Sequence, residues 1–155
     1  MYNYIGIDVS KKVLHAFNGK KYYQLKNEQH IPELDELIKE TGADIKKTIF
    51  IFEPTGAYSQ NLKRYCASRE IKVCIINPKQ SSHCSKALGN RRKNDKVDAK
   101  MLYRLQYLIS PEDISVPKID KHVQNLSTNI TVYEIAMKRR IMMSNELEAA
   151  KAKDP

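Results

Sequence analysis

Short apolar runs separated by turn residues divide the first part of the chain into strands. Residues 4–9 (YIGIDV) are mostly apolar and β-branched, and this pattern predicts a buried strand with an acidic residue near its end. Val13–Phe17 and Tyr22–Leu25 are two further runs on either side of Asn18-Gly19. Asn-Gly between apolar runs is a strong signal for a β-hairpin, because both residues tolerate positive φ. The chain is therefore expected to open with three consecutive antiparallel strands.

Helical and strand patterns alternate in the next segment. A helix is predicted from Pro32, which suits a first helical turn, to a stop at Gly42, with apolar residues at helical spacing between them. Thr48–Phe52 is a continuous apolar run, typical of a strand covered on both faces, and it ends at Glu53-Pro54 because proline cannot donate to a ladder. A second helix is predicted over residues 58–69, and a buried strand over residues 73–76.

A polar, basic stretch follows these elements. Residues 79–93 are expected to form a loop that leads into a helix starting near Asp95. The predicted order is therefore β-β-β-α-β-α-β-α. A hairpin run followed by alternating helices and strands indicates an α/β fold, in which a mixed sheet carries helices on both faces.

The last part of the chain has a different periodicity. Pro111 and Pro117 interrupt the pattern, and from residue 119 the apolar residues are spaced alternately by four and three positions, which is the heptad seam of a coiled coil. We therefore expect a domain over residues 1–110 and, over residues 111–155, a linker and a long helix. A seam this narrow favours pairing with another copy of the chain, and packing against its own domain is the alternative. The seam residues are Ile119, Val123, Leu126, Ile130, Tyr133 and Met137.

Composition argues against several classes of protein. The 155 residues are 41% hydrophobic and 29% charged, as in ordinary globular proteins and unlike disordered chains. No apolar run approaches the roughly 20 residues of a membrane span. The N-terminus does not have the pattern of a signal peptide. Three cysteines without a CxxC pair indicate a reducing compartment. We therefore expect neither a membrane protein nor a secreted one.

Basic charge is concentrated in one segment. The chain has 27 Lys+Arg against 18 Asp+Glu, for a net charge of +9, and this excess indicates a polyanionic partner. Within residues 86–104, a run of basic residues is opposed only by Asp95 and Asp98. A strip that only bound phosphates would bind them better without these carboxylates, so their presence indicates chemistry on phosphate. The candidate nucleic-acid-binding residues are Lys86, Arg91, Arg92, Lys93, Lys96 and Lys100.

Four acidic residues occupy special places in the predicted topology. Asp8 lies near the end of the first predicted strand and Glu53 ends the Thr48–Phe52 strand, so the two acids emerge side by side if these strands are neighbours. Asp95 and Asp98 share one face at the start of a helix. Carboxylates this close would repel one another, and divalent cations with oxygen ligands would neutralise them. Two Mg²⁺ ions can stabilise both oxygens of an in-line phosphoryl displacement. These four are the candidate catalytic and metal-binding residues; for any one of them alone, an ordinary surface acid is the alternative.

Three stretches of the sequence resemble one known family. IGIDVSKK (residues 5–12), FEPTGAY (52–58) and KNDKVDA (93–99) are similar to motifs in the N-terminal domain of the DEDD transposases of bacterial insertion sequences, the family that includes the Piv invertase. The resemblance covers residues 2–108. It implies a ribonuclease-H-like (RuvC-like) fold. It also implies the roles of the acids, with Asp8 first, Glu53 second, and Asp95 and Asp98 as the last two.

The resemblance further implies an activity and partners. It implies Mg²⁺-dependent DNA strand cleavage and exchange, with Mn²⁺ as a substitute ion, and some members are similar to recombinases guided by a structured RNA. DNA is therefore the expected partner and a guide RNA a further candidate, in the bacterial cytoplasm at the nucleoid. Family members continue into a second domain that supplies a catalytic serine. We expect that domain to be absent from this chain, and recombination by these residues alone to be incomplete.

Two other functions are compatible with the same residues. A Holliday-junction resolvase-like nuclease would use the same fold and acids on branched DNA. A non-catalytic nucleic-acid-binding and dimerisation module would use only the basic segment and the heptad helix. The DNA affinity of such a module would fall steeply with salt and survive the loss of all four carboxylates.

Overall fold

The computed structural model describes residues 2–87 and 94–152, and the chain divides into two compact units, Met1–Lys118 and Ile119–Pro155. The strands of the first unit are β1 (Asn3–Val9), β2 (Val13–Phe17), β3 (Tyr22–Lys26), β4 (Thr48–Phe52), β5 (Lys72–Ile75) and β6 (Ile114–Ser115). Its α-helices are α1 (Pro32–Glu40), α2 (Gln60–Ser68), α3 (Pro78–Ala87) and α4 (Asp95–Arg104), and the second unit contains α5 (Lys121–Lys151).

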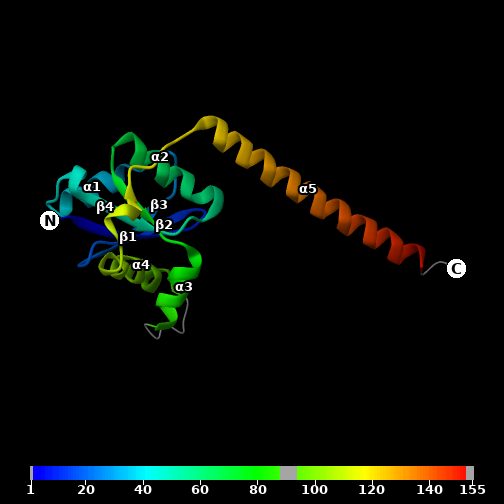
Figure 1. The fold of residues 1–155 in the computed structure, drawn as a ribbon, viewed down its shortest axis with the longest axis horizontal. Helices are drawn as coiled ribbons and strands as arrows, with labels where there is room; N and C mark the ends of the chain where they lie inside the picture. The colour runs from blue at the N-terminus through cyan, green and yellow to red at the C-terminus, as the bar shows by residue number, and fades with distance from the viewer. Residues whose placement is uncertain (1, 88–93, 153–155) are drawn as a thin grey trace. The chain divides into compact units, whose positions relative to one another are not determined.

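The strands form one mixed sheet in the order β3-β2-β1-β4-β5-β6. Figure 1 labels β1 to β4 of this sheet. β1, β2 and β3 pair antiparallel, as predicted from their turns. β4 is parallel to β1 and to β5, because helices carry the chain back between these strands. The short β6 adds an antiparallel edge that the sequence pattern did not predict. This α/β architecture is compatible with a ribonuclease-H-like fold, and the predicted mixed sheet and long C-terminal helix are confirmed.

The turn between β2 and β3 is built by Asn18 and Gly19. Gly19 has a φ of +90°, a conformation that glycine adopts without strain. The side-chain oxygen Oδ1 of Asn18 accepts hydrogen bonds from the backbone N–H groups of Lys20, at 3.0 Å, and of Lys21, at 2.7 Å. The Asn-Gly pair therefore forms the hairpin that its sequence predicts.

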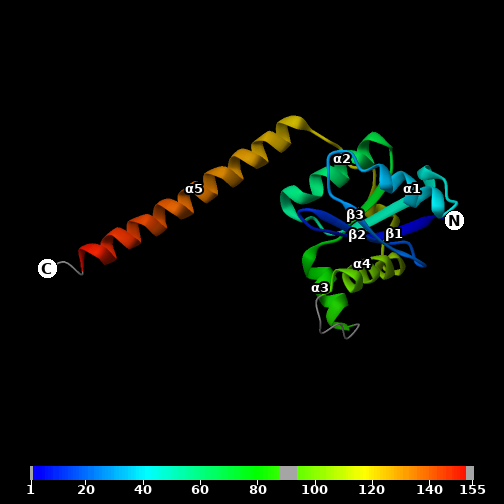
Figure 2. The ribbon, with the colours of Figure 1, turned by 180° about the vertical axis from the view of Figure 1, so that it is seen from behind.

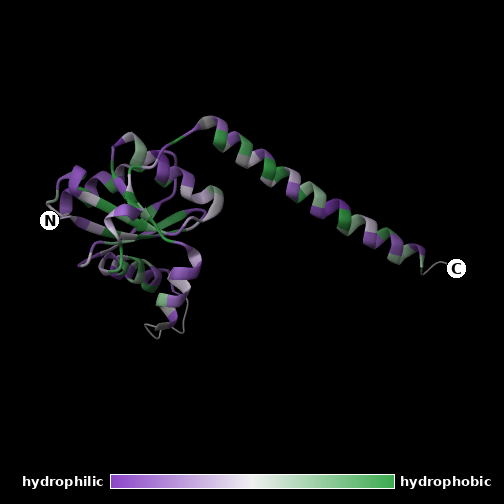
Figure 3. Cartoon of the chain, in the orientation of Figure 1, coloured by the Kyte–Doolittle hydropathy of each residue, from purple (hydrophilic) through white to green (hydrophobic). Residues whose placement is uncertain are grey.

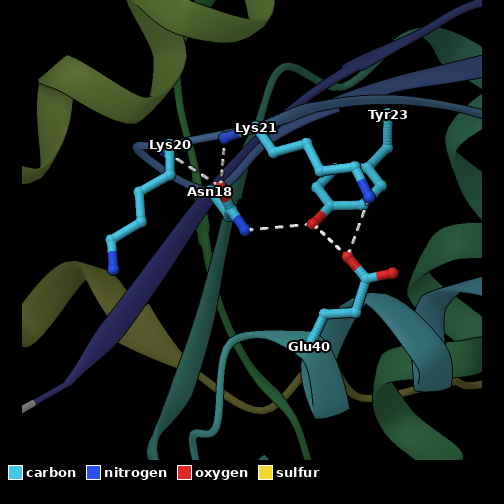
Figure 4. A network of polar contacts seen from close by, with 5 residues as sticks. All are labelled: Asn18, Lys20, Lys21, Tyr23 and Glu40. Carbon is cyan, nitrogen blue, oxygen red and sulfur yellow. Dashed lines mark hydrogen bonds and ion pairs between the residues drawn. The ribbon is translucent and has the colours of Figure 1, made fainter.

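A polar network connects this hairpin to the end of α1 (Figure 4). The Tyr23 hydroxyl donates a hydrogen bond of 2.7 Å to Oε2 of Glu40, and Nζ of Lys21 lies 3.1 Å from the same oxygen. Burial and the hydrogen bond to Glu40 raise the pKa of Tyr23 to about 12. The hydrogen bonds from Tyr23 and Lys21 lower the pKa of Glu40. The network therefore favours a charged Glu40 and a neutral Tyr23.

Side chains alternate along the strands and divide the core between the two faces of the sheet. Ile5 of β1 packs with Leu34 of α1 and Leu62 of α2 on one face. Ile51 of β4 packs with Met101 of α4 on the other face. Helices α1 and α2 therefore cover one face and α4 the other (Figures 1 and 2). Figure 3 shows the hydrophobic positions concentrated along the strands between these layers.

The prediction of a loop from residue 79 onward is wrong for the part that the structure describes. Residues 78–87 form α3, and residues 88–93 lie outside the described residues. Asn77 provides the start of the helix, because its Oδ1 accepts a hydrogen bond of 2.9 Å from the backbone N–H of Lys79. Pro78 occupies the first helical position, where its missing N–H costs nothing. The Asn-Pro pair thus starts a helix as well as closing the preceding strand.

The second unit contains the long helix α5. It begins after Asp120, whose Oδ1 accepts hydrogen bonds from the backbone N–H groups of His122, at 2.8 Å, and Val123, at 3.3 Å. Hydrophobic residues recur along its length (Figure 3). Across residues 2–87 and 94–152, no helix combines the length and apolar character needed to cross a bilayer. Exposed residues of the heptad seam include Val123 (61% exposed), Leu126 (61%), Ile130 (49%) and Tyr133 (65%).

Candidate metal centre

Two of the predicted acids lie at the same end of the two central parallel strands. Ile7 of β1 and Phe52 of β4 are register partners, and Asp8 and Glu53 are the next residues on each strand. Neighbouring residues at the same level of two parallel strands face the same side of the sheet, so Asp8 and Glu53 are directed to one face. Side chains alternate between the two faces along β1, so this is also the face on which Gly6 lies. That face is the one covered by α4.

Helix α4 lies directly against β1. A Cβ atom added to Gly6 would overlap the carbonyl oxygen of Ala99 and the backbone nitrogen of Tyr103. Only glycine permits so close an approach of two backbones. The first turn of α4 is capped by Asn94, whose Oδ1 accepts a hydrogen bond of 3.0 Å from the backbone N–H of Lys96. The start of the helix is therefore held over the end of β1.

This packing brings three carboxylates together. Asp8 of β1 and Asp95 and Asp98 of α4 each offer a carboxylate oxygen, and these oxygens all lie within 4.8 Å of one another. Asp8 and Asp98 are half-buried, whereas Asp95 is exposed. Three negative charges at this separation repel one another, and a cation between them would remove the repulsion. An all-oxygen set suits a hard divalent cation such as Mg²⁺, so the residues present fit such an ion.

Glu53 is not part of this three-carboxylate group. It is half-buried and directly follows β4, one position beyond the register partner of Ile7. Within the part of the chain that the structure describes, Asp8, Asp95 and Asp98 are the group of acids close enough to share an ion. The structure thus brings three of the four predicted acids together and leaves Glu53 at the same end of the sheet, outside the group.

Basic side chains lie beside the carboxylates on α4. Lys96 and Lys100 are exposed. The Nζ atom of Lys96 lies 5.0 Å from the centre of the Tyr22 ring, and Nζ of Lys100 lies 5.2 Å from the centre of the Phe17 ring. These cation–π contacts align both ammonium groups along the β2–β3 side of the helix. Lys86 is exposed near the end of α3. The other predicted basic residues, Arg91, Arg92 and Lys93, lie outside the described residues.

His15 and Tyr22 adjoin the carboxylates and were not predicted as site residues. Nε2 of His15 lies 3.2 Å from Oδ2 of Asp95, and Nδ1 of His15 forms a hydrogen bond with the Tyr22 hydroxyl. Burial and the negative charges of Asp95 and Asp8 raise the pKa of Tyr22. A signal for His15 was present in the sequence. The connection between β1 and β2 is short, so the strands pair from Val9 and Leu14 outward and the next partners are Asp8 and His15. Antiparallel partners lie on the same face of the sheet, which places His15 beside Asp8.

Asn27 connects the two loops that follow Asp8 and Glu53. Its Nδ2 group donates hydrogen bonds to the backbone oxygens of Ser10, at 2.7 Å, and Tyr58, at 2.9 Å. Asn27 is buried, with 8% of its surface exposed, so these bonds are shielded from water. No pattern in the sequence pointed to this residue, because its partners are distant along the chain.

Comparisons with known proteins identify the family of this chain. A family model for DEDD transposases of the IS110 type, described as "Transposase", matches residues 5–150. The chain is 33% identical over 126 residues to the pilin gene-inverting protein of Moraxella lacunata, covering 78% of this chain and 39% of that protein. It is 32% identical over 126 residues to the pilin gene-inverting protein of Moraxella bovis, with the same coverage of 78% and 39%. The chain thus spans about two fifths of the length of these curated relatives. It belongs to the IS110-type DEDD transposase family.

Proposed function

We propose that this chain is the catalytic domain of a DNA transposase or site-specific recombinase. Its reaction is metal-dependent cleavage and exchange of DNA strands. The observation that carries the proposal is the group formed by Asp8, Asp95 and Asp98, whose carboxylate oxygens lie within 4.8 Å of one another in a chain of this family. The Moraxella relatives are named for inverting a pilin gene, and inversion of a DNA segment requires strands to be cut and rejoined.

In this proposal Asp8, Asp95 and Asp98 hold Mg²⁺ or Mn²⁺, and Glu53 adds a fourth carboxylate from the same end of the sheet. A bound ion supplies Lewis-acid stabilisation to phosphoryl oxygens. The protein itself holds the carboxylates in place before the ion and the DNA bind. Asp8 is held in a central strand and Asp98 in a helix packed directly on that strand, so the carboxylates need little rearrangement before reaction.

DNA is the proposed partner. We propose that the protein acts on it at the bacterial nucleoid. Lys96 and Lys100 extend beside the carboxylates, where ammonium groups would attract the phosphates of a strand to be cleaved. Lys86 would add a further phosphate contact from α3. We include Arg91, Arg92 and Lys93 in the proposed interface because they precede α4 directly in the sequence.

We also propose that α5 pairs with the same helix of a second copy. Its seam residues Val123, Leu126 and Ile130 are each about half or more exposed. Apolar side chains repeated at heptad spacing are buried when two such helices associate. A dimer would present two copies of the metal centre, which suits exchange between two DNA segments.

The function is tested by incubating the chain with end-labelled linear DNA from the region flanking its gene and with a four-way junction. Each substrate is tested with Mg²⁺, Mn²⁺ or EDTA. We expect cleavage that needs the metal and is lost in Asp8→Asn, while Glu36→Gln, on the opposite face of the sheet, cleaves normally. Unchanged cleavage by Asp8→Asn would exclude the proposed centre. A preference for the junction would favour a resolvase-like nuclease. DNA binding without cleavage, surviving loss of all four acids, would favour a binding module.

A further inference from the structure

His15 connects the proposed metal centre to the core of the hairpin. It is buried, with 8% of its surface exposed, and it is the register partner of Asp8 in the β1–β2 pair. Its Nε2 atom lies 3.2 Å from Oδ2 of Asp95, whose side chain is 58% exposed. The contact therefore joins a residue held by the sheet to the most exposed member of the three-carboxylate group.

The hydrogen-bonding partners of His15 define the role of each ring nitrogen. A carboxylate only accepts hydrogen bonds, so Nε2–H of His15 donates to Asp95. In the neutral imidazole with this tautomer, Nδ1 accepts from the Tyr22 hydroxyl. The rings of His15 and Tyr22 are also stacked, with centres 5.8 Å apart and planes 23° from parallel. Tyr22, His15 and Asp95 thus form a directed chain of hydrogen bonds in which the imidazole has one orientation.

The Asp95 side chain is less constrained by its surroundings than those of Asp8 and Asp98, so a hydrogen bond from His15 restricts it more. Asp8 lies within a strand and Asp98 one turn into α4, and both are half-buried. Asp95 is the first residue of α4, and a side chain exposed at a helix end samples several rotamers. His15 is outside the group of side chains close enough to share an ion, so its place is behind Asp95 rather than among the ligands.

We propose that His15 is a positioning residue that orients the Asp95 carboxylate toward Asp8 and Asp98 through the Tyr22–His15–Asp95 chain of hydrogen bonds. This inference rests on the proposed function of the three carboxylates as a metal centre. Outer-shell partners of metal ligands commonly contribute about 10–100-fold to metal affinity. The same loss is expected here when the hydrogen bond to Asp95 is removed.

The test is titration of the 155-residue chain with Mn²⁺ alone, followed by calorimetry and by the electron paramagnetic resonance of the bound ion. His15→Ala should weaken Mn²⁺ binding about 10–100-fold. His15→Gln, whose side-chain amide can place a donor near the Nε2 position, should restore most of the affinity. Tyr22→Phe keeps the ring and removes only the hydroxyl, so a smaller loss is expected. Thermal unfolding without metal provides the control for folding.

The outcomes separate this inference from the proposed function. If His15→Ala binds Mn²⁺ as the wild type does while Asp8→Asn does not bind, the positioning role is wrong and the metal centre stands. If the wild type has no Mn²⁺ site that depends on Asp8, the metal centre is wrong and the inference falls with it. If His15→Ala does not fold, Tyr22→Phe decides: weaker binding supports the role, and unchanged binding overturns it.

Discussion

Gly6 and Ala99 bring β1 and α4 into direct backbone contact. A Cβ atom on Gly6 would overlap the carbonyl oxygen of Ala99, so no other residue type fits at this position without moving the helix. Gly6 precedes Asp8 by two residues on the same face of β1, and Ala99 follows Asp98 directly. The glycine therefore sets the separation between two of the three carboxylates.

Substitution of Gly6 by alanine should damage both stability and metal binding. Backbone atoms of α4 cannot yield to the added methyl group as a flexible side chain would, so we expect a loss of about 3 kcal/mol in the free energy of unfolding, near the upper end of overpacking costs. Displacement of α4 should also weaken Mn²⁺ binding. Urea unfolding and Mn²⁺ titration measure the two effects.

Gly42→Ala is the matched control for this substitution. Gly42 has a φ of +66° and no atom within 4 Å of an added Cβ, so only backbone strain of about 1–2 kcal/mol is expected. Its Mn²⁺ affinity should equal that of the wild type. Wild-type Mn²⁺ affinity in Gly6→Ala would show that the close contact does not position the carboxylates.

Lys96 and Lys100 should contribute to DNA binding through phosphate contacts. Lys96→Ala and Lys100→Ala should each weaken binding and reduce by about one the slope of log affinity against log salt concentration. Fluorescence anisotropy at several salt concentrations measures that slope. Lys39→Ala removes an exposed lysine from α1, on the other face of the sheet, and should leave the slope unchanged. Equal slopes in all three variants would place the interface elsewhere.

The heptad seam of α5 should mediate self-association. Leu126 is 61% exposed, and burying one leucine is worth about 1.5–3 kcal/mol. A homodimer buries this residue from both copies, so its substitution is expected to raise the dissociation constant roughly 100-fold or more. Leu126→Lys should therefore shift sedimentation-velocity profiles toward the monomer. Asn129→Lys introduces the same charge at an exposed position outside the seam and should not do so. A monomeric wild type at high concentration would contradict the pairing.

The Tyr23–Glu40 hydrogen bond should make stability depend on pH at both ends of the scale. The pKa of Tyr23 is raised to about 12 in the folded protein, so its contribution is complete below its ordinary value of 10.0 and is lost as pH rises through about 12. The pKa of Glu40 is lowered, so its contribution is present above 4.5 and is lost as pH falls through the lower folded value.

Tyr23→Phe tests this dependence. The variant should be less stable than the wild type near neutral pH, and the difference should shrink both above pH 10.0 and below pH 4.5. Urea unfolding across this range measures the difference. Tyr107→Phe, at a tyrosine that is 80% exposed, should follow the wild-type curve. A constant difference between Tyr23→Phe and the wild type at every pH would argue against coupling to ionisation.

Local signals were sufficient for most of the elements. Asn18-Gly19 predicted a turn whose geometry is contained within residues 18–21, and the largely apolar run Thr48–Phe52 predicted β4 with its observed bounds. The prediction failed at residues 78–87. A basic composition suggested a loop there, whereas the Asn77-Pro78 pair starts α3. Capping chemistry is local too, so the sequence itself contains the signal for this helix.

The site was only partly accessible from the sequence. Asp95 and Asp98 share a helical face through their spacing, Asp8 lies near the end of β1, and Glu53 directly follows β4. These relations depend on backbone periodicity alone. That Glu53 stays outside the group of three, and that His15 contacts Asp95, depends on how α4 crosses the sheet at Gly6. The way α4 crosses β1 depends on how the surfaces of the helix and the sheet pack together, which sequence periodicity does not specify.

Periodicity, turn residues and the placement of acids along the chain predicted the α/β class, the antiparallel pairing of β1, β2 and β3, and the candidate ligands. These features follow from neighbours in sequence, whose geometry is limited by the backbone. Three features depend on the packing of segments that are distant in sequence. They are the distances between the carboxylates, the contact of His15 with Asp95, and the hydrogen bonds from Asn27 to Ser10 and Tyr58. Side chains contact one another only within a few ångströms, so the tertiary structure determines which of these groups meet.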